Sequence, residues 1–283
     1  MPNDTTVITV GHNSEGVIKG LLDSLPYHAS TIVVDNASTD STSNVANDAA
    51  PEAKILRLTR NEGFGRACNF GAEFAETTYL FFVNPDARLA PGTINALENA
   101  ADRLPNFVAG NPLMLSCKGN ARIKTTSILP LKKIPRPQLT KDSELAVLSG
   151  AAFFVKKQDF HAVGGFDPGI FLYHEDHDLS TRLVSEGGKL WHVAGASALH
   201  VAGAGSTRST KIAFFKGYHM ARSRHYVLKK YNQPAAMLRT IGPAIFGLLL
   251  PHNLLSARRR AKHKGQIKGA FSSFSDNGKC SLS

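Results

Sequence analysis

The chain has 283 residues, of which 42% are hydrophobic and 19% charged, and its net charge at pH 7 is +11. This composition excludes a disordered or fibrous protein and leaves room for one large domain with an appendage. The three cysteines are widely separated and odd in number, which excludes a disulfide framework and a paired zinc site. A reducing compartment is the simplest inference.

The positive charge is concentrated towards the C-terminus. Residues 206–283 contain 15 Lys and Arg and one acidic residue, Asp276, so this segment carries +14 and the first 205 residues carry −3. Such a segment indicates a polyanionic partner, either nucleic acid or an anionic lipid surface. The first residues lack the basic start and apolar core of a signal peptide, so we expect a cytosolic protein or one attached to the cytosolic face of a membrane.

Strand and helix patterns alternate over the first hundred residues. Short apolar runs predict strands at 5–10, 32–34, 54–58 and 79–83. Apolar residues at helical spacing predict helices at 17–25, 41–50 and 66–75. This alternation predicts an α/β fold with a mostly parallel sheet flanked by helices and joined by right-handed crossovers.

The second half is less regular. Between residues 105 and 141, four prolines and six Lys or Arg favour a long surface connection. Ordered structure is expected again at 145–155, followed by a helix at 180–186 and a strand at 189–193.

The strand at 79–83 ends in Asn84-Pro85-Asp86. Because proline cannot continue a central strand, the strand must stop near Asn84 and place Asp86 just past its C-terminal edge. Ligands of open α/β sheets bind at that edge. A carboxylate there could also simply cap the next helix.

A second acidic cluster, Glu175, Asp176 and Asp178, precedes the helix predicted at 180–186. Neighbouring carboxylates repel one another unless a cation, a substrate or a helix N-terminus offsets their charge. Asp176 or Asp178 could cap the helix, and we expect Asp178 to play such a supporting role. Glu175 and Asp176 are better placed to face a cleft, where one can act as a general base.

Seven short motifs occur in an order and spacing that resembles the inverting family 2 glycosyltransferases of the GT-A fold, within them the rhamnosyltransferase-like branch. The resemblance covers about residues 5–230, and no single motif is specific. The motifs are residues 10–14 (VGHNS, usually with Tyr in place of the His), 34–40 (VDNASTD), 61–65 (NEGFG) with Asn69, 84–86 (NPD), 149–151 (SGA), 164–167 (GGFD) and 175–179 (EDHDL).

The resemblance implies a nucleotide-sugar site. Asp35 would accept a hydrogen bond from the imide of a pyrimidine base, and Arg66 would lie along the ribose and diphosphate with the glycine loop before it. The residues assigned to the nucleotide-sugar are Val10, His12, Asn13, Asp35, Asn36, Asn61, Gly63, Gly65, Arg66, Asn84, Asp86 and Gly150.

The resemblance also implies a divalent cation, Mg²⁺ or Mn²⁺, held by Asp86. His200 would be a further ligand or a contact to the diphosphate, or else a structural residue. Asn84 stands where many GT-A enzymes have the first Asp of Asp-x-Asp, so we expect a weaker and more exchangeable metal.

The implied reaction is a single in-line displacement. Asp176 would act as the base on the acceptor hydroxyl, with Glu175 beside it. The expected donor is dTDP-rhamnose or a UDP-hexose, and the expected acceptor is a lipid-linked or polysaccharide glycan of the cell envelope. An inactive nucleotide-sugar-binding scaffold is the alternative from another class.

The tail completes the organisation that we predict, with a catalytic domain at 1–230 and a basic, amphipathic helical tail at 231–283. The apolar stretch 241–255 is short and is broken by glycines and prolines, and Arg258-Arg259-Arg260 follows it. This pattern favours attachment to an anionic membrane surface over nucleic acid, for which the tail has no reader motif. Packing on its own domain or on a second copy in a homo-oligomer remains the alternative.

Overall fold

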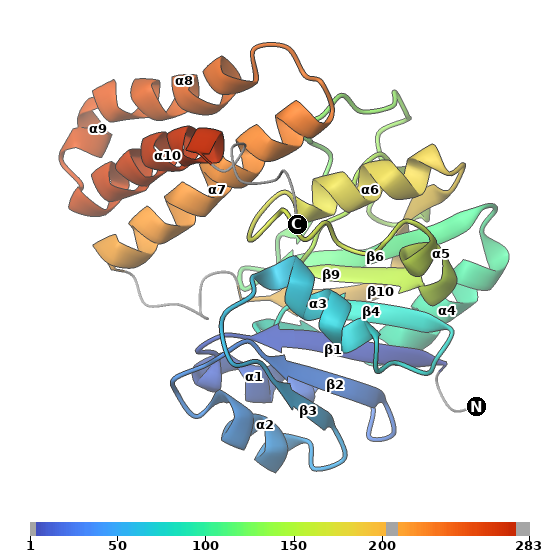
Figure 1. Cartoon of the computed structure of the whole chain (residues 1–283). Helices are drawn as coiled ribbons and strands as arrows, with labels where there is room; N and C mark the ends of the chain where they lie inside the picture. Colours follow the sequence, from blue (N-terminus) through green and yellow to red (C-terminus); the bar gives the residue numbers. More distant parts are fainter. Residues whose placement is uncertain (1–3, 202–208, 276–283) are drawn as a thin grey trace, which may run out of the picture. The chain divides into compact units, whose positions relative to one another are not determined.

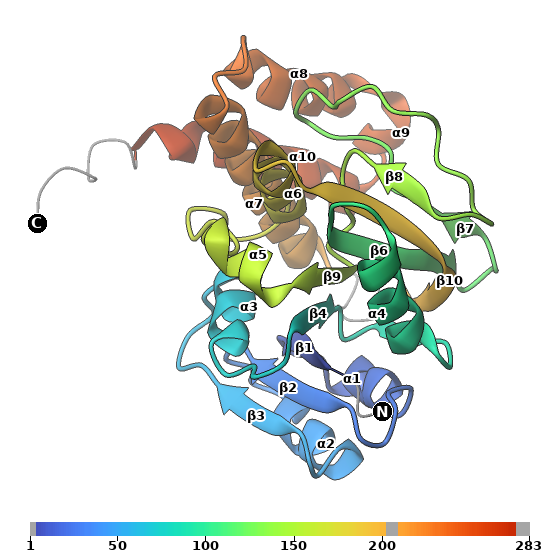
Figure 2. The ribbon, with the colours of Figure 1, turned by 90° about the vertical axis from the view of Figure 1, so that its right-hand side faces the viewer.

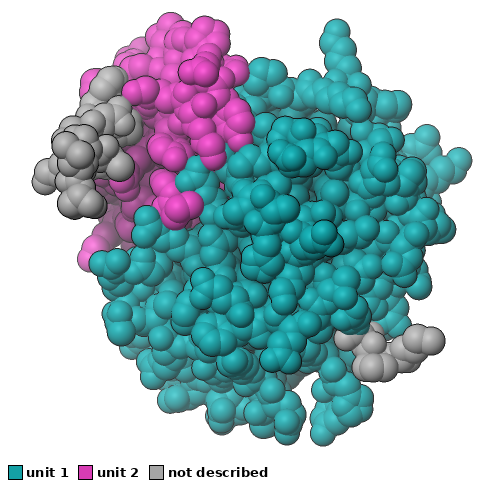
Figure 3. All heavy atoms as spheres, turned by 45° about the vertical axis from the view of Figure 1, so that its right-hand side comes forward, with its two compact units in different colours: residues 1–167, 176–205 teal, residues 168–175, 206–283 magenta. Residues whose placement is uncertain are grey.

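The computed structural model describes residues 4–201 and 209–275. The chain divides into two compact units, one formed by residues 1–167 and 176–205 and the other by residues 168–175 and 206–283 (Figure 3). Helix α7 (Thr210–Lys230) therefore groups with the tail helices, whereas the boundary expected from the sequence lay at its end, after residue 230.

The first unit is built on one sheet with the strand order β3-β2-β1-β4-β9-β6-β10-β5 (Figure 1), to which β7 and β8 are added beside β6 and β10. The strands are β1 Thr5–Gly11, β2 Ser30–Asp35, β3 Lys54–Arg57, β4 Tyr79–Val83, β5 Ala87–Leu89, β6 Phe107–Ser116, β7 Ala121–Arg122, β8 Ser143–Leu145, β9 Ala152–Lys156 and β10 Lys189–His200.

The sheet is parallel where the sequence predicted it. Strands β1 to β4 pair in parallel, with Gly11 opposite Asp35 and Ile8 opposite Phe82. Beyond β4 the sheet is mixed, because β9 pairs antiparallel with both β4 and β6 before β10 pairs in parallel with β6. The insertion of β9 brings residues 149–151 to the end of β4.

Helices cover both faces of this sheet (Figure 2). On one face, α3, α5 and α6 pack through residues such as Cys68, Phe160 and Leu179. On the other face, α1, α2 and α4 pack through residues such as Ile18 and Leu97. The bounds are α1 Glu15–Leu22, α2 Thr42–Ala49, α3 Phe64–Ala72, α4 Thr93–Arg103, α5 Lys157–Ala162 and α6 Glu175–Ser185.

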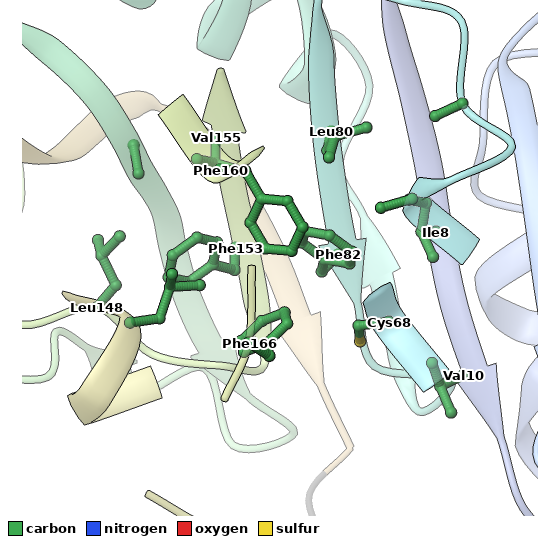
Figure 4. Packing of buried hydrophobic residues seen from close by; sticks show 14 of the residues in the cluster. Ile8, Val10, Cys68, Leu80, Phe82, Leu148, Phe153, Val155, Phe160 and Phe166 are labelled. Carbon is green, nitrogen blue, oxygen red and sulfur yellow. The ribbon is translucent and has the colours of Figure 1, made fainter. Parts of the chain in front are cut away.

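The apolar runs of the central strands become the core because alternate residues point to opposite faces. In β4, Leu80 and Phe82 join the cluster beneath α3. The alternate residues Tyr79, Phe81 and Val83 join the cluster on the other face. Phe82 lies against Phe160 and Phe166 in an aromatic group that also includes Phe153 (Figure 4). This core fixes the strand ends from which the polar side chains project.

The second unit is helical. Helices α7 and α10 (Ala257–Ser275) pack along each other, joined by α8 (Ala236–Leu249) and the short α9 (Pro251–Leu254). A Cβ atom on Gly217 would lie 2.2 Å from the carbonyl oxygen of Lys262, and one on Gly269 would lie 2.0 Å from that of Tyr218. The two helices can approach this closely only because glycines line the contact. No helix in the described part of the chain is both long and apolar enough to cross a membrane.

Three predictions for the second half were wrong. The helix expected at 180–186 begins at Glu175, since acidic residues favour the first turn of a helix. The strand expected at 189–193 continues to His200. The connection at 105–141 contains β6 and β7, and it buries Ile128 and Leu129, so it is not only a surface segment.

Candidate active site

The carboxylate of Asp35, at the end of β2, is held by hydrogen bonds from neighbouring residues. Asp35 is 1% exposed, its Oδ1 accepts a 2.8 Å hydrogen bond from the Ser38 amide, and its Oδ2 accepts one from the Ser43 hydroxyl. Burial raises the pKa of Asp35, but these hydrogen bonds, with Arg57 3.4 Å away, outweigh it and hold the pKa below its usual value. Asp35 is therefore ionised and rigid, and each of its oxygens can still accept a second bond.

Two loops meet beside Asp35. The ring Nδ1 of His12 donates a 2.9 Å hydrogen bond to the carbonyl oxygen of Asn36. The Asn36 side chain donates to Asn61 Oδ1 at 3.1 Å and to the carbonyl oxygen of Gly63 at 3.2 Å. Asn13 has a φ of 52° and accepts a hydrogen bond from the Thr39 amide. These contacts bring the predicted residues of the two loops together.

The other residues assigned to the nucleotide differ in how they could contribute. The Val10 side chain packs in the core and its backbone pairs with β2, so it offers no side-chain contact to a ligand. Gly63 adopts a φ of 84° as the N-cap of α3, a conformation that favours glycine, and Gly65 is buried in the first turn. Arg66 is about half exposed and its guanidinium lies 3.6 Å from Glu62.

The tight turn after β4 places Asp86 opposite the end of β10. The amide of Ala87 donates to the carbonyl oxygen of Asn84, closing the turn, and the amide of Val201 donates to the carbonyl oxygen of Asp86. His200 Nε2 lies 3.1 Å from Asp86 Oδ1. The Asp86 and His200 side chains are 13% and 28% exposed, so the pair is partly open to solvent. Two residues separated by 114 positions thus meet at the end of β4.

This pair fits a divalent cation that has few protein ligands. A carboxylate oxygen and an imidazole nitrogen are accepted ligands of Mn²⁺, and two ligand atoms on one octahedral ion with bonds of about 2.1 Å are separated by about 3 Å. Within residues 4–201 and 209–275, no three His, Cys, Asp or Glu side chains gather into a metal-binding cluster. A cation here would therefore be coordinated also by water and by the phosphate groups of a bound nucleotide.

Asp176 lies in the first turn of α6, with its side chain 14% exposed. Its Oδ2 accepts hydrogen bonds from Lys124 Nζ at 2.5 Å and from the Gly150 amide at 2.9 Å, and its Oδ1 lies 3.7 Å from His177 Nε2. Burial raises the pKa of Asp176, but Lys124, His177 and the Gly150 amide outweigh it and hold the pKa below its usual value. The carboxylate is therefore ionised and held in one place.

Glu175 precedes Asp176 and is buried at 8% exposure. The two residues before it, Tyr173 and His174, have φ angles of 69° and 68°, a region that residues with a Cβ rarely adopt. Burial and the Glu175 charge raise the pKa of Tyr173 to about 12. Asp178 lies within the first turn of α6, which begins at Glu175. It is fully buried, and its Oδ2 lies 2.7 Å from Arg182 Nη2.

A series of short contacts links the pair at Asp86 to Asp176. The amide of Asn84 donates to the carbonyl oxygen of Ala151 at 2.9 Å, and the preceding amide, that of Gly150, donates to Asp176. Asn111 fixes this segment, because its Oδ1 accepts from the Ser149 amide and its Nδ2 donates to the Ser149 carbonyl oxygen. Gly150, assigned to the nucleotide from the sequence, therefore holds the candidate base.

Sequence reasoning missed Lys124 and Asn111. Lys124 lies in the segment interpreted as a surface connection, and nothing local indicates a partner 52 positions away. Asn111 is 5% exposed within the β6 strand, where a polar residue amid apolar neighbours was the one available signal.

Comparison with known proteins identifies the family of this chain. The family model described as glycosyl transferase family 2 matches residues 6–164, more than half of the chain. The N-acetylglucosaminyl-diphospho-decaprenol L-rhamnosyltransferase of Mycobacterium tuberculosis is 32% identical over 202 residues, covering 60% of this chain and 66% of that protein. Rhamnosyltransferase WbbL of Escherichia coli is 26% identical over 251 residues, covering 79% of this chain and 92% of that protein.

Among solved structures, the mannosyltransferase PcManGT from Pyrobaculum calidifontis, in complex with GDP-Man and Mn²⁺, matches with a TM-score of 0.58 at 18% identity. The match covers 96% of this chain and 87% of that one, so the fold is shared although the sequences have diverged. The chain therefore belongs to glycosyl transferase family 2, in the rhamnosyltransferase-like branch and with the GT-A type of fold that the motifs implied.

Proposed function

We propose that this protein is an inverting glycosyltransferase that moves L-rhamnose from dTDP-rhamnose to a lipid-linked or polysaccharide acceptor during assembly of a cell-envelope glycan. The observation that carries the proposal is the contact series from Asp86 and His200, through Asn84, Ala151 and Gly150, to Asp176. It joins a candidate site for a diphosphate and its cation to a buried, ionised carboxylate at the same end of β4. A transferase needs both groups at one reaction centre.

The reaction follows from these two groups. The acceptor hydroxyl attacks the anomeric carbon as the bond from that carbon to the diphosphate oxygen breaks, and Asp176 takes the hydroxyl proton. Because Oδ2 of Asp176 is held by Lys124 and Gly150, Oδ1 is the oxygen better placed to accept that proton. The nucleoside diphosphate leaves with the bonding electrons. One displacement on one face of the sugar inverts the anomeric configuration.

The residues around the leaving group hold and orient it. Asp86 and His200 would bind Mg²⁺ or Mn²⁺, which supplies positive charge that offsets the charge of the departing diphosphate. The backbone around Gly63 and the guanidinium of Arg66 are candidates to contact the same diphosphate, and Asp35 to accept from the base. Because hydrogen bonds already hold these loops in place, a ligand loses less binding free energy to loop ordering.

The choice of donor and acceptor rests on the relatives. The two relatives are named rhamnosyltransferases, and the name of the mycobacterial protein specifies an acceptor built on a diphosphate-linked polyprenol. That protein is matched over 66% of its length, and we carry over only the class of donor and acceptor. A lipid-linked acceptor places the reaction next to a membrane, and nucleotide-sugars place it on the cytosolic face.

Thermal unfolding with a panel of nucleotide-sugars tests the donor, since a ligand that binds only the folded state raises the melting temperature. We expect dTDP-rhamnose to stabilise the protein in the presence of Mg²⁺ or Mn²⁺, and release of dTDP to follow when a glycosyl-diphospho-lipid is added. Stabilisation by UDP-hexoses but not by dTDP-rhamnose would move the assignment to a UDP-hexose-dependent enzyme. Binding without transfer or hydrolysis of any donor would leave a nucleotide-sugar-binding scaffold.

A further inference from the structure

The exposed face of α8 is apolar, contrary to the usual pattern of a surface helix. Leu238, Ile245, Phe246 and Leu249 are 71%, 48%, 65% and 70% exposed. Their spacing of seven, eight and eleven residues from Leu238 puts them on one side of the helix. The buried side instead carries the small residues Thr240, Ala244 and Gly247.

Packing within the second unit fixes this orientation. A Cβ atom on Gly247 would lie 2.4 Å from the His263 ring, so the small-residue side of α8 is pressed against α10. Asn253 in α9 donates a 2.7 Å hydrogen bond to the carbonyl oxygen of Gly247, which ties the end of α8 to the next turn. Rotating α8 to bury its large apolar residues would place Leu or Phe where the structure leaves room only for glycine.

The apolar surface continues through α9 and ends at three arginines. Leu254 and Leu255 are 49% and 88% exposed. Helix α10 begins two residues later and has Arg258, Arg259 and Arg260 in its first turn. We call Leu238, Ile245, Phe246, Leu249, Leu254 and Leu255 the apolar ridge. Several large exposed apolar residues on one helix face and in the turn that follows indicate an interaction surface, whereas single exposed apolar residues do not.

The charge of the second unit identifies the chemistry of its partner. Residues 209–275 contain 13 Lys and Arg and no Asp or Glu. The partner must therefore be anionic next to the arginines and apolar next to the ridge. A nucleic acid supplies the charge without an apolar layer, whereas an anionic bilayer has a charged headgroup region directly above its hydrocarbon.

We propose that the apolar ridge inserts into the headgroup and upper acyl region of an anionic membrane, with Arg258, Arg259 and Arg260 on the lipid headgroups. Helix α8 has 14 residues and so spans about 21 Å, against about 30 Å of hydrocarbon core, which fits a helix lying along the surface. This membrane contact rests on the proposed function and deepens it, because a lipid-linked acceptor is presented at the membrane surface. The contact can nevertheless be tested without measuring turnover.

The test is sedimentation of the full chain with vesicles of phosphatidylcholine alone or mixed equally with phosphatidylglycerol. We expect binding to the anionic vesicles that weakens with salt, since the Debye length falls from about 10 Å at 0.1 M to about 3 Å at 1 M. Replacing the three arginines with Gln should weaken binding on the order of 100-fold at low salt, at roughly fivefold per charge. The matched control replaces the exposed Lys118, Arg136 and Lys141 of the first unit with Gln and should leave binding nearly unchanged.

The ridge is tested separately with Phe246→Ser and Leu249→Ser, and Tyr27→Ser, which removes an 87% exposed ring in the first unit, is the control. Because the substituted residues are exposed, the melting temperatures of these variants should match that of the unmutated protein. Equal losses in the target and control variants would overturn the proposal, as would equal binding to neutral and anionic vesicles. It would also be overturned by a dimer that the ridge variants dissociate while vesicle binding persists, or by preference for duplex DNA over vesicles.

A thermal shift with dTDP-rhamnose, measured on the same preparation, separates the two proposals. If dTDP-rhamnose gives no thermal shift while vesicle binding is intact, the proposed function is contradicted and the membrane proposal is not affected. Donor binding and transfer to a short soluble acceptor should persist in the ridge and arginine variants, because these residues lie outside the candidate active site.

Discussion

Lys124 Nζ lies 2.5 Å from Asp176 Oδ2, and this ion pair occupies one oxygen of the candidate catalytic base. A cation at this distance keeps the carboxylate ionised but also weakens it as a base. The side chains are only 22% and 14% exposed, so water screens the interaction little. Lys124 thus sets the protonation of Asp176 as well as its position.

Lys124→Gln should shift the acidic limb of the pH profile of kcat/KM towards higher pH. Burial would then act with less opposition, so the Asp176 pKa would rise and the base would be lost to protonation at a higher pH. A positive charge on His177, whose Nε2 lies 3.7 Å from Asp176 Oδ1, would act against this rise. Lys118→Gln, at an exposed position of the same segment, is the control, and superimposable profiles for the two variants would contradict the role given to Lys124.

Asp176→Asn should reduce turnover about 100-fold or more while leaving donor affinity within a few-fold. The amide keeps the size of the carboxylate and can still accept from the Gly150 amide, but it cannot take the acceptor proton. Steady-state kinetics with a thermal shift for the donor separates the two effects. Near-normal turnover would move the role of base to Glu175 or to another group.

Asp86→Ala should remove the part of donor binding that depends on Mg²⁺ or Mn²⁺, and a chelator should have the same effect on the unmutated protein. His200→Ala should weaken the metal dependence less, because an anionic ligand is lost only with Asp86. Donor-induced thermal shifts with and without metal provide the measurement. Asp48→Ala removes an exposed carboxylate from α2 and is the matched control. Full activity in excess chelator would remove the cation from the mechanism.

Gly217→Ala should destabilise the helical unit by about 1 to 3 kcal/mol. The new methyl group would lie 2.2 Å from the carbonyl oxygen of Lys262, so α7 and α10 would have to separate. Gly16→Ala in α1 is the matched control, since a Cβ there meets nothing within 4 Å and alanine is the better helix former. Thermal unfolding of both variants checks the prediction, and equal melting temperatures would contradict it.

The sequence was most informative where a strand ends in polar residues. The turn after β4 follows directly from Pro85, and the parallel pairing of β1, β2 and β4 follows from the alternation of strands and helices. Asp86 and His200 could be brought together only through the family resemblance, because β10 was expected to end seven residues too early. Strand continuation depends on pairing with β6 and β5, which no local pattern records.

The surroundings of Asp176 were less predictable. The helix start at Glu175 was missed because the acidic cluster was interpreted as a loop facing a cleft rather than as a first helical turn. Lys124 was missed because its proline-rich segment resembles a linker. The contact between Gly150 and Asp176 depends on β9 entering the sheet between β4 and β6, a long-range pairing that composition and periodicity do not specify.

The glycine contact between α7 and α10 sets a limit on how the chain can be shortened. A deletion of the residues after Leu255, made to remove the basic segment, would also remove α10. This helix covers Gly217 and the backbone carbonyls of Phe214 and Tyr218. The side of α7 that α10 covers would then be exposed to solvent, together with the backbone around Gly217. We expect such a truncated protein to aggregate or be digested by proteases, so solubility is better sought by polar substitutions on the apolar ridge with α10 retained.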